Sequence, residues 1–149
     1  DKETVANYID LLEKCFVVFR LPSFSRNLRS EIKKGKKIYF YDNGIRNALI
    51  SNFAPLELRN DVGALWENFI ISERIKQNAY NQRDAQLYFW RTVEQQEVDF
   101  IEIYDGQMIA FEMKWRKRKA SFPSSFSQNY PEAQFQIINQ DNYIQWLNQ

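Results

Sequence analysis

The chain has 149 residues, of which 44% are hydrophobic and 16% aromatic, so it is long and apolar enough to bury a core. A charged fraction of 26% and a net charge of +1 exclude the composition typical of disorder. The net charge by itself indicates nothing for or against a nucleic-acid partner. One cysteine, Cys15, excludes an internal disulfide and a cysteine-rich zinc site.

The sequence contains no histidine, which excludes Ser-His and Cys-His nucleophile pairs and histidine-ligated zinc. Any catalysis must therefore use carboxylates, Lys, Tyr or Ser, with or without a hard metal ion. No apolar run is long enough to span a membrane and no signal peptide is visible, so we expect a cytoplasmic protein without a membrane partner. The chain begins with Asp1 rather than Met, as expected of a fragment.

The first third of the sequence predicts a helix, two strands and a second, short helix. Residues 4–16 place apolar side chains at helical spacing, with Thr4 as a candidate cap. Residues 16–22 and 37–42 are β-rich and flank a polar, basic stretch, and residues 43–52 predict the short helix. Helix, strand, basic loop and strand in this order outline part of a winged helix.

From residue 61 the sequence predicts a long helix, three strands, a possible helical turn, a fourth strand and a terminal helix. Asp61 is a good N-cap for the long helix, and Asp141 for the terminal one. The fold class expected from this order is α+β. The predicted elements are residues 61–78, 85–92, the hairpin 97–115, then 121–133, 135–140 and 141–149.

The hairpin at residues 97–115 carries a strong turn signal in Asp105-Gly106, because a type I′ turn requires positive φ at both central positions. That turn fixes the register of the two strands. The register predicts that Asp99 lies directly opposite Glu112, with their Cβ atoms roughly 4.5–5.5 Å apart. Two like charges at this distance destabilise a sheet, and a divalent cation between them would relieve the repulsion.

The same register predicts that Glu97 lies opposite Lys114 and that both share a face with Asp99 and Glu112. Two carboxylates with a lysine suit metal-assisted phosphodiester hydrolysis, in which the lysine positions or activates the attacking water. The alternative is a solvated strand end in which Glu97 and Lys114 form an ordinary cross-strand ion pair.

Asp99, followed by Glu112-Met113-Lys114 on the next strand, resembles the D…(D/E)-x-K signature of the PD-(D/E)XK nuclease superfamily. The resemblance implies a restriction-endonuclease-like core with the order α, β, β, β, α, β. It also implies a Glu on the first core helix as a further metal ligand, and Glu67 matches that position. Glu67, Asp99 and Glu112 would then bind Mg²⁺ or Mn²⁺, and Asp99, Glu112 and Lys114 would act in DNA cleavage.

Five short segments also resemble, in order, the C-terminal domain of unknown function of prokaryotic AAA-type predicted ATPases. In those proteins an ATPase module precedes a winged-helix segment and a nuclease-like domain. The resemblance implies a partial winged helix at residues 1–50 and a nuclease-like domain at residues 51–149. ATP would bind only to an upstream module of the same protein, because no G-x-x-x-x-G-K-[ST] loop is present here. The five segments are residues 36–50, 61–70, 88–92, 97–103 and 111–115.

Two basic runs, residues 33–37 and 116–119, could contact a phosphate backbone. The alternatives are a basic loop for the first run and a solvated strand end for the second. The candidates for DNA contact are Lys33, Lys34, Arg116, Lys117, Arg118 and Lys119.

The superfamily often adds a Gln or Lys from the helix after the third core strand, and Gln128 is a possible accessory residue on that basis. The same fold also serves proteins without activity. The alternative function is therefore a catalytically inactive module that binds DNA or a partner and regulates an attached ATPase. A third hypothesis is a partner-binding domain with no nucleic-acid role, which predicts no salt-dependent DNA binding.

Overall fold

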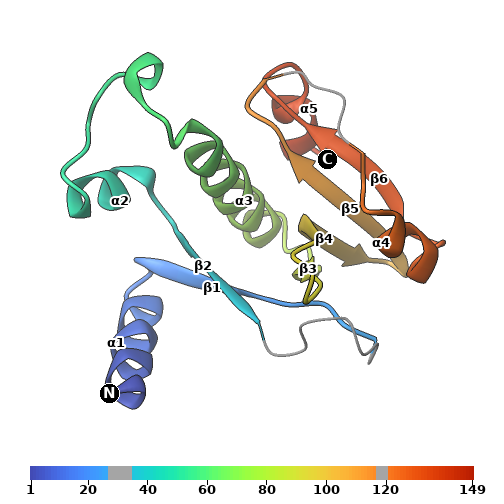
Figure 1. The fold of residues 1–149 in the computed structure, drawn as a ribbon, viewed down its shortest axis with the longest axis horizontal. Coiled ribbons are helices and arrows are strands. Elements are labelled where there is room, and N and C mark those ends of the chain that lie inside the picture. Colours follow the sequence, from blue (N-terminus) through green and yellow to red (C-terminus); the bar gives the residue numbers. More distant parts are fainter. Residues whose placement is uncertain (27–34, 117–120) are drawn as a thin grey trace.

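The computed structural model describes residues 1–26, 35–116 and 121–149. Its N-terminal part contains helical segments and a two-stranded antiparallel sheet (Figure 1). The sequence predicted each of these elements except the short 3-10 helix η1. They are α1 (Lys2–Lys14), β1 (Val18–Pro22), β2 (Lys36–Phe40), α2 (Asn43–Leu49) and η1 (Leu56–Leu58).

The C-terminal part has the predicted element order, and the fold class is α+β as expected. Its four strands form one sheet in the order β3-β4-β5-β6, in which β5 and β6 are parallel and the other neighbours antiparallel. Within the described ranges, no helix combines the length and apolar character needed to cross a bilayer. The elements are α3 (Val62–Tyr80), β3 (Gln86–Arg91), β4 (Glu97–Tyr104), β5 (Gln107–Met113), α4 (Ser124–Asn129), β6 (Gln134–Ile138) and α5 (Tyr143–Leu147).

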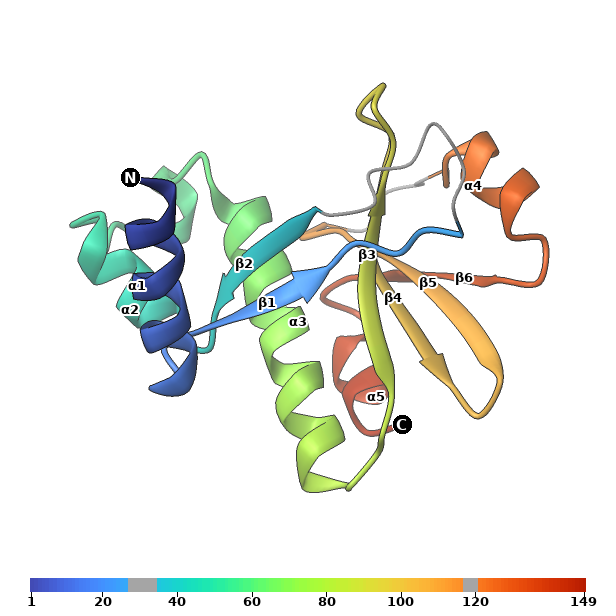
Figure 2. The ribbon, with the colours of Figure 1, turned by 90° about the horizontal axis from the view of Figure 1, so that it is seen from below.

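The four-stranded sheet carries helices on both faces (Figures 1 and 2). One buried cluster joins α3 and α5 to the sheet through residues such as Ile70, Phe111 and Trp146. A second cluster joins α4 to the sheet through Phe126 and Ala110. Because Ala110 and Phe111 are consecutive in β5, they point to opposite faces, so α4 lies across the sheet from α3.

The β1–β2 sheet packs into the first of these clusters rather than forming a core of its own. Phe19 and Leu21 of β1 and Tyr39 of β2 are buried in the cluster that contains Phe89 of β3. Ser23 and Phe89 form an isolated parallel bridge, which places the end of β1 beside β3 (Figure 2). The N-terminal segment and the four-stranded sheet therefore share one hydrophobic core.

Two helices begin at other residues than the sequence predicted. Asp1, not Thr4, caps α1, and its side chain accepts a hydrogen bond from the backbone N–H of Glu3 at 3.3 Å. Asn142, not Asp141, occupies the N-cap position of α5. The predicted caps were wrong because several residues near each start have suitable side chains, and local sequence does not rank them.

Asp61 holds the predicted N-cap position of α3, but its side chain makes no capping hydrogen bond. Its carboxylate instead accepts from Arg46 at 2.8 Å and from two nitrogens of Arg59, both at 2.8 Å. These arginines hold the pKa of Asp61 below its usual range. The contact ties α2 and the segment after η1 to the start of α3.

A buried ion pair joins α3 to the sheet. Arg74 donates from Nε and Nη2 to the carboxylate of Glu102 at 2.8 and 3.0 Å, and from Nη1 to the carbonyl of Trp146 at 2.9 Å. Arg83 adds a second cation at 2.8 Å from Glu102. The side chains of Arg74 and Glu102 are 4% and 1% exposed, so each depends on the other for charge compensation.

Arg74→Met is expected to lower the free energy of unfolding by about 3 kcal/mol, because Glu102 would be left buried with Arg83 alone. The matched control is Lys76→Met on the same helix, whose partly exposed pair with Glu73 should contribute under about 0.5 kcal/mol. Urea denaturation of both variants measures the difference. Equal losses would show that the buried pair contributes no more than the surface pair.

Candidate functional site

Strand β4 contains a β-bulge at the point where the candidate acids lie. The pairing of β3 with β4 shifts by one residue there, so that Phe89 alone lies opposite Asp99 and Phe100. Val98 and Ile101, on either side of this pair, both belong to the core cluster that contains α4. Asp99 and Phe100 consequently both point toward α3, whereas a regular strand would send them to opposite faces.

The pairing of β4 with β5 confirms the predicted register as far as Phe100 and Phe111, and then ends. Asp99 and Glu112 therefore do not pair, and this prediction was wrong because the bulge interrupts β4 at Asp99. In a regular antiparallel ladder the N–H of Met113 would donate to the next β4 carbonyl. Here Oδ2 of Asp99 accepts that N–H at 2.9 Å, so the carboxylate ends the ladder where the strands separate.

Three carboxylates from two elements converge beside the bulge. Glu67 comes from the second turn of α3, and Glu97 and Asp99 come from the same face of β4. One oxygen of each carboxylate lies within 4.8 Å of the other two, and all three side chains are partly buried. Glu112, which the resemblance implied as a metal ligand, is not part of this acidic cluster.

Basic side chains from neighbouring strands contact two members of the acidic cluster. Nζ of Lys37 on β2 lies 2.9 Å from Oε1 of Glu67 and also contacts Oε1 of Glu97. Arg91 on β3 pairs with the other oxygen of Glu97. Asp99 has no ion-pair partner among the described residues and accepts only the backbone hydrogen bond from Met113. The cluster thus keeps one carboxylate without a cation.

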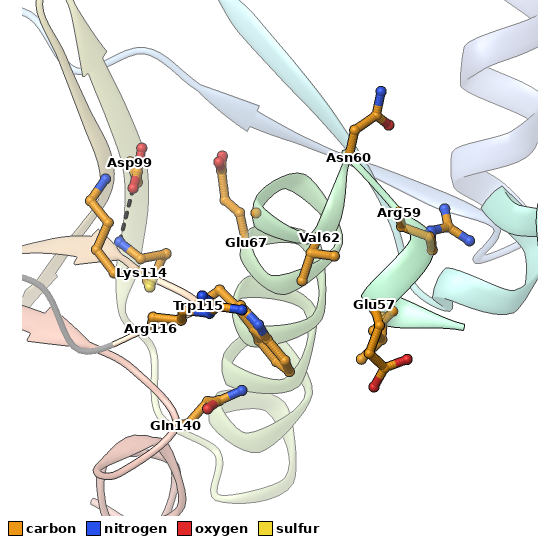
Figure 3. A pocket seen from close by; sticks show the side chains of 13 residues that line it. Glu57, Arg59, Asn60, Val62, Glu67, Asp99, Lys114, Trp115, Arg116 and Gln140 are labelled. Atoms are coloured by element: carbon orange, nitrogen blue, oxygen red, sulfur yellow. Dashed lines mark hydrogen bonds between the residues drawn. The ribbon is translucent and has the colours of Figure 1, made fainter. Parts of the chain in front are cut away.

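Lys114 follows β5 directly and binds Glu112, two residues before it. The predicted pairing of Lys114 with Glu97 does not form, because Glu97 pairs with an arginine of β3 across the other side of β4. Lys114 nevertheless lies in the same cleft as Asp99 and Glu67 (Figure 3). The structure therefore brings three of the four predicted residues to one cleft, with Glu112 bound to the lysine.

The cleft has a volume of about 850 Å³. Glu67, Asp99 and Lys114 lie together on one side of it, and η1 and the residues that follow line the opposite side (Figure 3). Arg116 and Gln140 also line the cleft. The cleft therefore combines carboxylates, the ligands that a hard metal ion requires, with a lysine and an arginine, the side chains that bind a phosphate group.

The other predicted residues do not reach this cleft or cannot be placed. Gln128 is exposed on α4, across the sheet from α3, and does not line the cleft. Gln140, which follows β6, lines it instead. Five of the six predicted DNA-contacting residues lie outside the described residues, namely Lys33, Lys34, Lys117, Arg118 and Lys119.

The surroundings of Asp99 favour its protonated form. Burial raises the pKa of Asp99 to about 7, and the charges of Glu67 and Glu112 add to the effect. The N–H of Met113 and the cation of Lys37 act in the opposite direction but do not outweigh it. Near neutral pH, the proton on Asp99 offsets part of the negative charge of the cluster.

The two lysines near the acids are held in their charged form. Burial would lower the pKa of Lys37, but Glu67 and Glu97 outweigh it and raise the pKa. Burial would likewise lower the pKa of Lys114, but Glu112 and then Asp99 outweigh it and raise the pKa. Lys114 is therefore suited to orient a water or stabilise negative charge, and poorly suited to remove a proton.

The acidic cluster has the donor chemistry of a hard-cation site. Mg²⁺ takes oxygen ligands at 2.0–2.1 Å, so two ligands of one ion are at most about 4.2 Å apart. A spacing within 4.8 Å for Glu67, Glu97 and Asp99 needs only a small closure to reach that limit. The residues present therefore fit Mg²⁺ or Mn²⁺, provided that the ammonium of Lys37 leaves the cluster.

Sequence reasoning placed Glu97 on the same strand face as Asp99 but gave it no role in metal binding. It missed two further residues that shape the site. Lys37 and Tyr39 had no usable signal, because they reach Glu67 only through the packing of β2 against α3. Contacts between residues about thirty positions apart leave no local pattern in a single sequence.

The fold and cleft define an α+β domain with a carboxylate cluster beside a split in its sheet. Residues 62–148 match the family described as Domain of unknown function (DUF4143), and because the match covers more than half of the chain, the chain belongs to this family. Residues 1–56 match a second family, Domain of unknown function (DUF8612).

Two curated relatives are uncharacterized proteins, one from Mycobacterium tuberculosis (strain ATCC 25618 / H37Rv) and one from Mycobacterium bovis (strain ATCC BAA-935 / AF2122/97). Each is 31% identical over 113 residues, which cover 74% of this chain and 25% of the relative. The matched part of the chain therefore spans a quarter of the length of these relatives. No solved structure matches the chain.

Asp99→Asn is expected to make stability less dependent on pH. The pKa of Asp99 is about 7 in the folded protein, against an ordinary value near 3.9 in the unfolded chain. Between about pH 4 and pH 7 the folded state holds a proton that the unfolded state releases, so stability falls as pH rises. Asn cannot titrate and can still accept from Met113.

Urea denaturation in EDTA at pH 4.5, 6 and 7.5 measures this effect. Wild type should lose about 3 kcal/mol more than Asp99→Asn across that range. The matched control is Asp105→Asn in the exposed hairpin turn, where Asn also suits the positive φ of 50°. Parallel pH profiles for wild type and Asp99→Asn would show that Asp99 does not retain its proton.

Proposed function

We propose that this chain contains a metal-dependent nuclease site that hydrolyses phosphodiester bonds in DNA. The observation that supports the proposal is the convergence of Glu67, Asp99 and Lys114, from three separate elements, on one cleft. These are residues that the D…(D/E)-x-K resemblance implies, and hard oxygen ligands beside a lysine suit this chemistry.

Each residue has a distinct role in this proposal. Glu67 and Asp99 would hold Mg²⁺ or Mn²⁺, with Glu97 or Glu112 as a further ligand. The bound ion would supply Lewis-acid polarisation of the phosphate. Lys114 would orient the attacking water and stabilise the negative charge that develops on the phosphate. Asp99 would release its proton when the ion binds, so metal affinity should rise with pH.

Two further features support the proposal. The order from α3 to β6 agrees with the α, β, β, β, α, β order of the restriction-endonuclease-like core that the resemblance implies. Arg116 lines the same cleft and could neutralise a backbone phosphate. We also propose that the chain is part of a longer AAA-type ATPase with a winged helix, since its relatives extend well beyond the matched region.

Incubation with single- and double-stranded DNA in the presence of Mg²⁺ or Mn²⁺ tests the nuclease proposal. The Asp99→Ala, Lys114→Ala double variant should cut roughly 100-fold more slowly than wild type, because a metal ligand and a charge-stabilising cation are both lost. The matched control is Lys36→Ala, Asp105→Asn, which removes the same two charges away from the cleft. Cleavage by wild type no faster than by the double variant would contradict the proposal.

A second candidate function is partner or DNA binding without catalysis, in regulation of an attached ATPase. It is favoured by the exposed apolar side chains of the N-terminal segment. α1 has no buried residue, and Tyr8, Leu11 and Phe16 are 65%, 55% and 74% exposed. An exposed apolar face of this kind typically contacts another protein surface.

Calorimetric titration separates the two candidates. Binding of Mn²⁺ that is lost in Asp99→Ala supports the nuclease site. DNA binding without any metal binding at millimolar Mn²⁺ supports the second candidate instead.

A further inference from the structure

We propose that Lys37 is a built-in competitor of the metal ion. Its ammonium occupies the acidic cluster when no divalent cation is bound, and it must leave before one can bind. The inference rests on the metal site proposed above and concerns how that site is regulated. Because Lys37 belongs to β2, the N-terminal segment controls access to a site formed by α3 and β4.

The ammonium of Lys37 lies between two members of the cluster. It is 2.9 Å from Oε1 of Glu67 and also contacts Oε1 of Glu97. A metal ion that used both glutamates would need the space that this ammonium fills. The side chain is 17% exposed and its Nζ lies 5.5 Å from the ring centroid of Phe89, so the stem is covered on its way to the acids.

β2 is fixed to α3 by contacts that do not involve Lys37. The side chain of Asn68 accepts from the N–H of Phe40 at 2.8 Å and donates to its carbonyl at 2.8 Å. The hydroxyl of Tyr39 donates to Glu67 at 2.6 Å. These bonds hold the strand in place while the lysine side chain rotates, so exchange requires only a side-chain movement.

Charge determines the direction of the exchange. Lys37 supplies one positive charge to a cluster of three carboxylates, whereas a divalent cation supplies two. A metal ion at sufficient concentration therefore displaces the ammonium. Its apparent affinity is the intrinsic affinity multiplied by the fraction of molecules in which Lys37 has left the cluster. A partner that draws β2 or Lys37 away would raise metal affinity without touching the acids.

The test is calorimetric titration of Mn²⁺ into the wild-type chain, Lys37→Met and the control Lys36→Met. Lys36 is the preceding residue on β2 and is exposed. Lys36→Met therefore removes the same charge at a position that does not contact the cluster. Lys37→Met is expected to bind Mn²⁺ at least tenfold more tightly than wild type, and Lys36→Met to bind like wild type.

The outcomes separate this inference from the metal site itself. If Lys37→Met alone binds Mn²⁺ more tightly, or binds it where wild type does not, the result supports Lys37 as a competitor of the metal ion. Equal affinity in all three proteins, or an equal gain in both variants, overturns it and leaves the metal site intact. No binding by any of them overturns both. Circular dichroism measures whether Lys37→Met folds with and without Mn²⁺. Folding only with Mn²⁺ supports the inference that Lys37 and the metal ion compete, and failure to fold even with Mn²⁺ overturns it.

Discussion

The bulge in β4 is the constraint on which the candidate site depends. By inserting one residue opposite Phe89, it turns Asp99 toward α3 instead of toward α4. The Asp99 carboxylate then accepts a hydrogen bond from the N–H of Met113, which in a regular ladder would donate to a carbonyl of β4. The bulge therefore coincides with the end of the pairing between β4 and β5. It also places the Asp99 carboxylate beside Glu67, where it accepts the hydrogen bond of the Met113 N–H. Bulges next to functional sites commonly redirect side chains in this way.

The charges around Asp99 are closely interdependent. Lys37 compensates Glu67 and, together with Arg91, Glu97. Burial, with the charges of Glu67 and Glu112, raises the pKa of Asp99 to about 7. A divalent ion would replace both the proton and the lysine. On the proposals made above, the acidic cluster would bind either the ammonium of Lys37 or a divalent cation. Because Lys37 belongs to the N-terminal segment, this exchange would link the two parts of the chain, which already share a core.

The sequence predicted those features that depend on local pattern. The order of elements and the Asp105-Gly106 turn, with φ of 50° and 74°, follow from short-range signals and are confirmed. The predicted pairing of Asp99 with Glu112 was wrong, because the bulge lies in the pairing of β4 with β3, which the hairpin sequence does not specify. Glu67 was reached only through the family resemblance, and Lys37 by neither route, since its contacts with the acids are long-range.

The central claim is that the acidic cluster binds a divalent cation in place of Lys37. A crystal structure with Mn²⁺ soaked in, analysed by anomalous scattering, tests it most directly. The account predicts a manganese peak between Glu67 and Asp99, with Nζ of Lys37 moved away from both glutamates. Crystals grown at neutral pH and soaked at millimolar Mn²⁺ that show no peak there, with Lys37 still bound to Glu67 and Glu97, would contradict it.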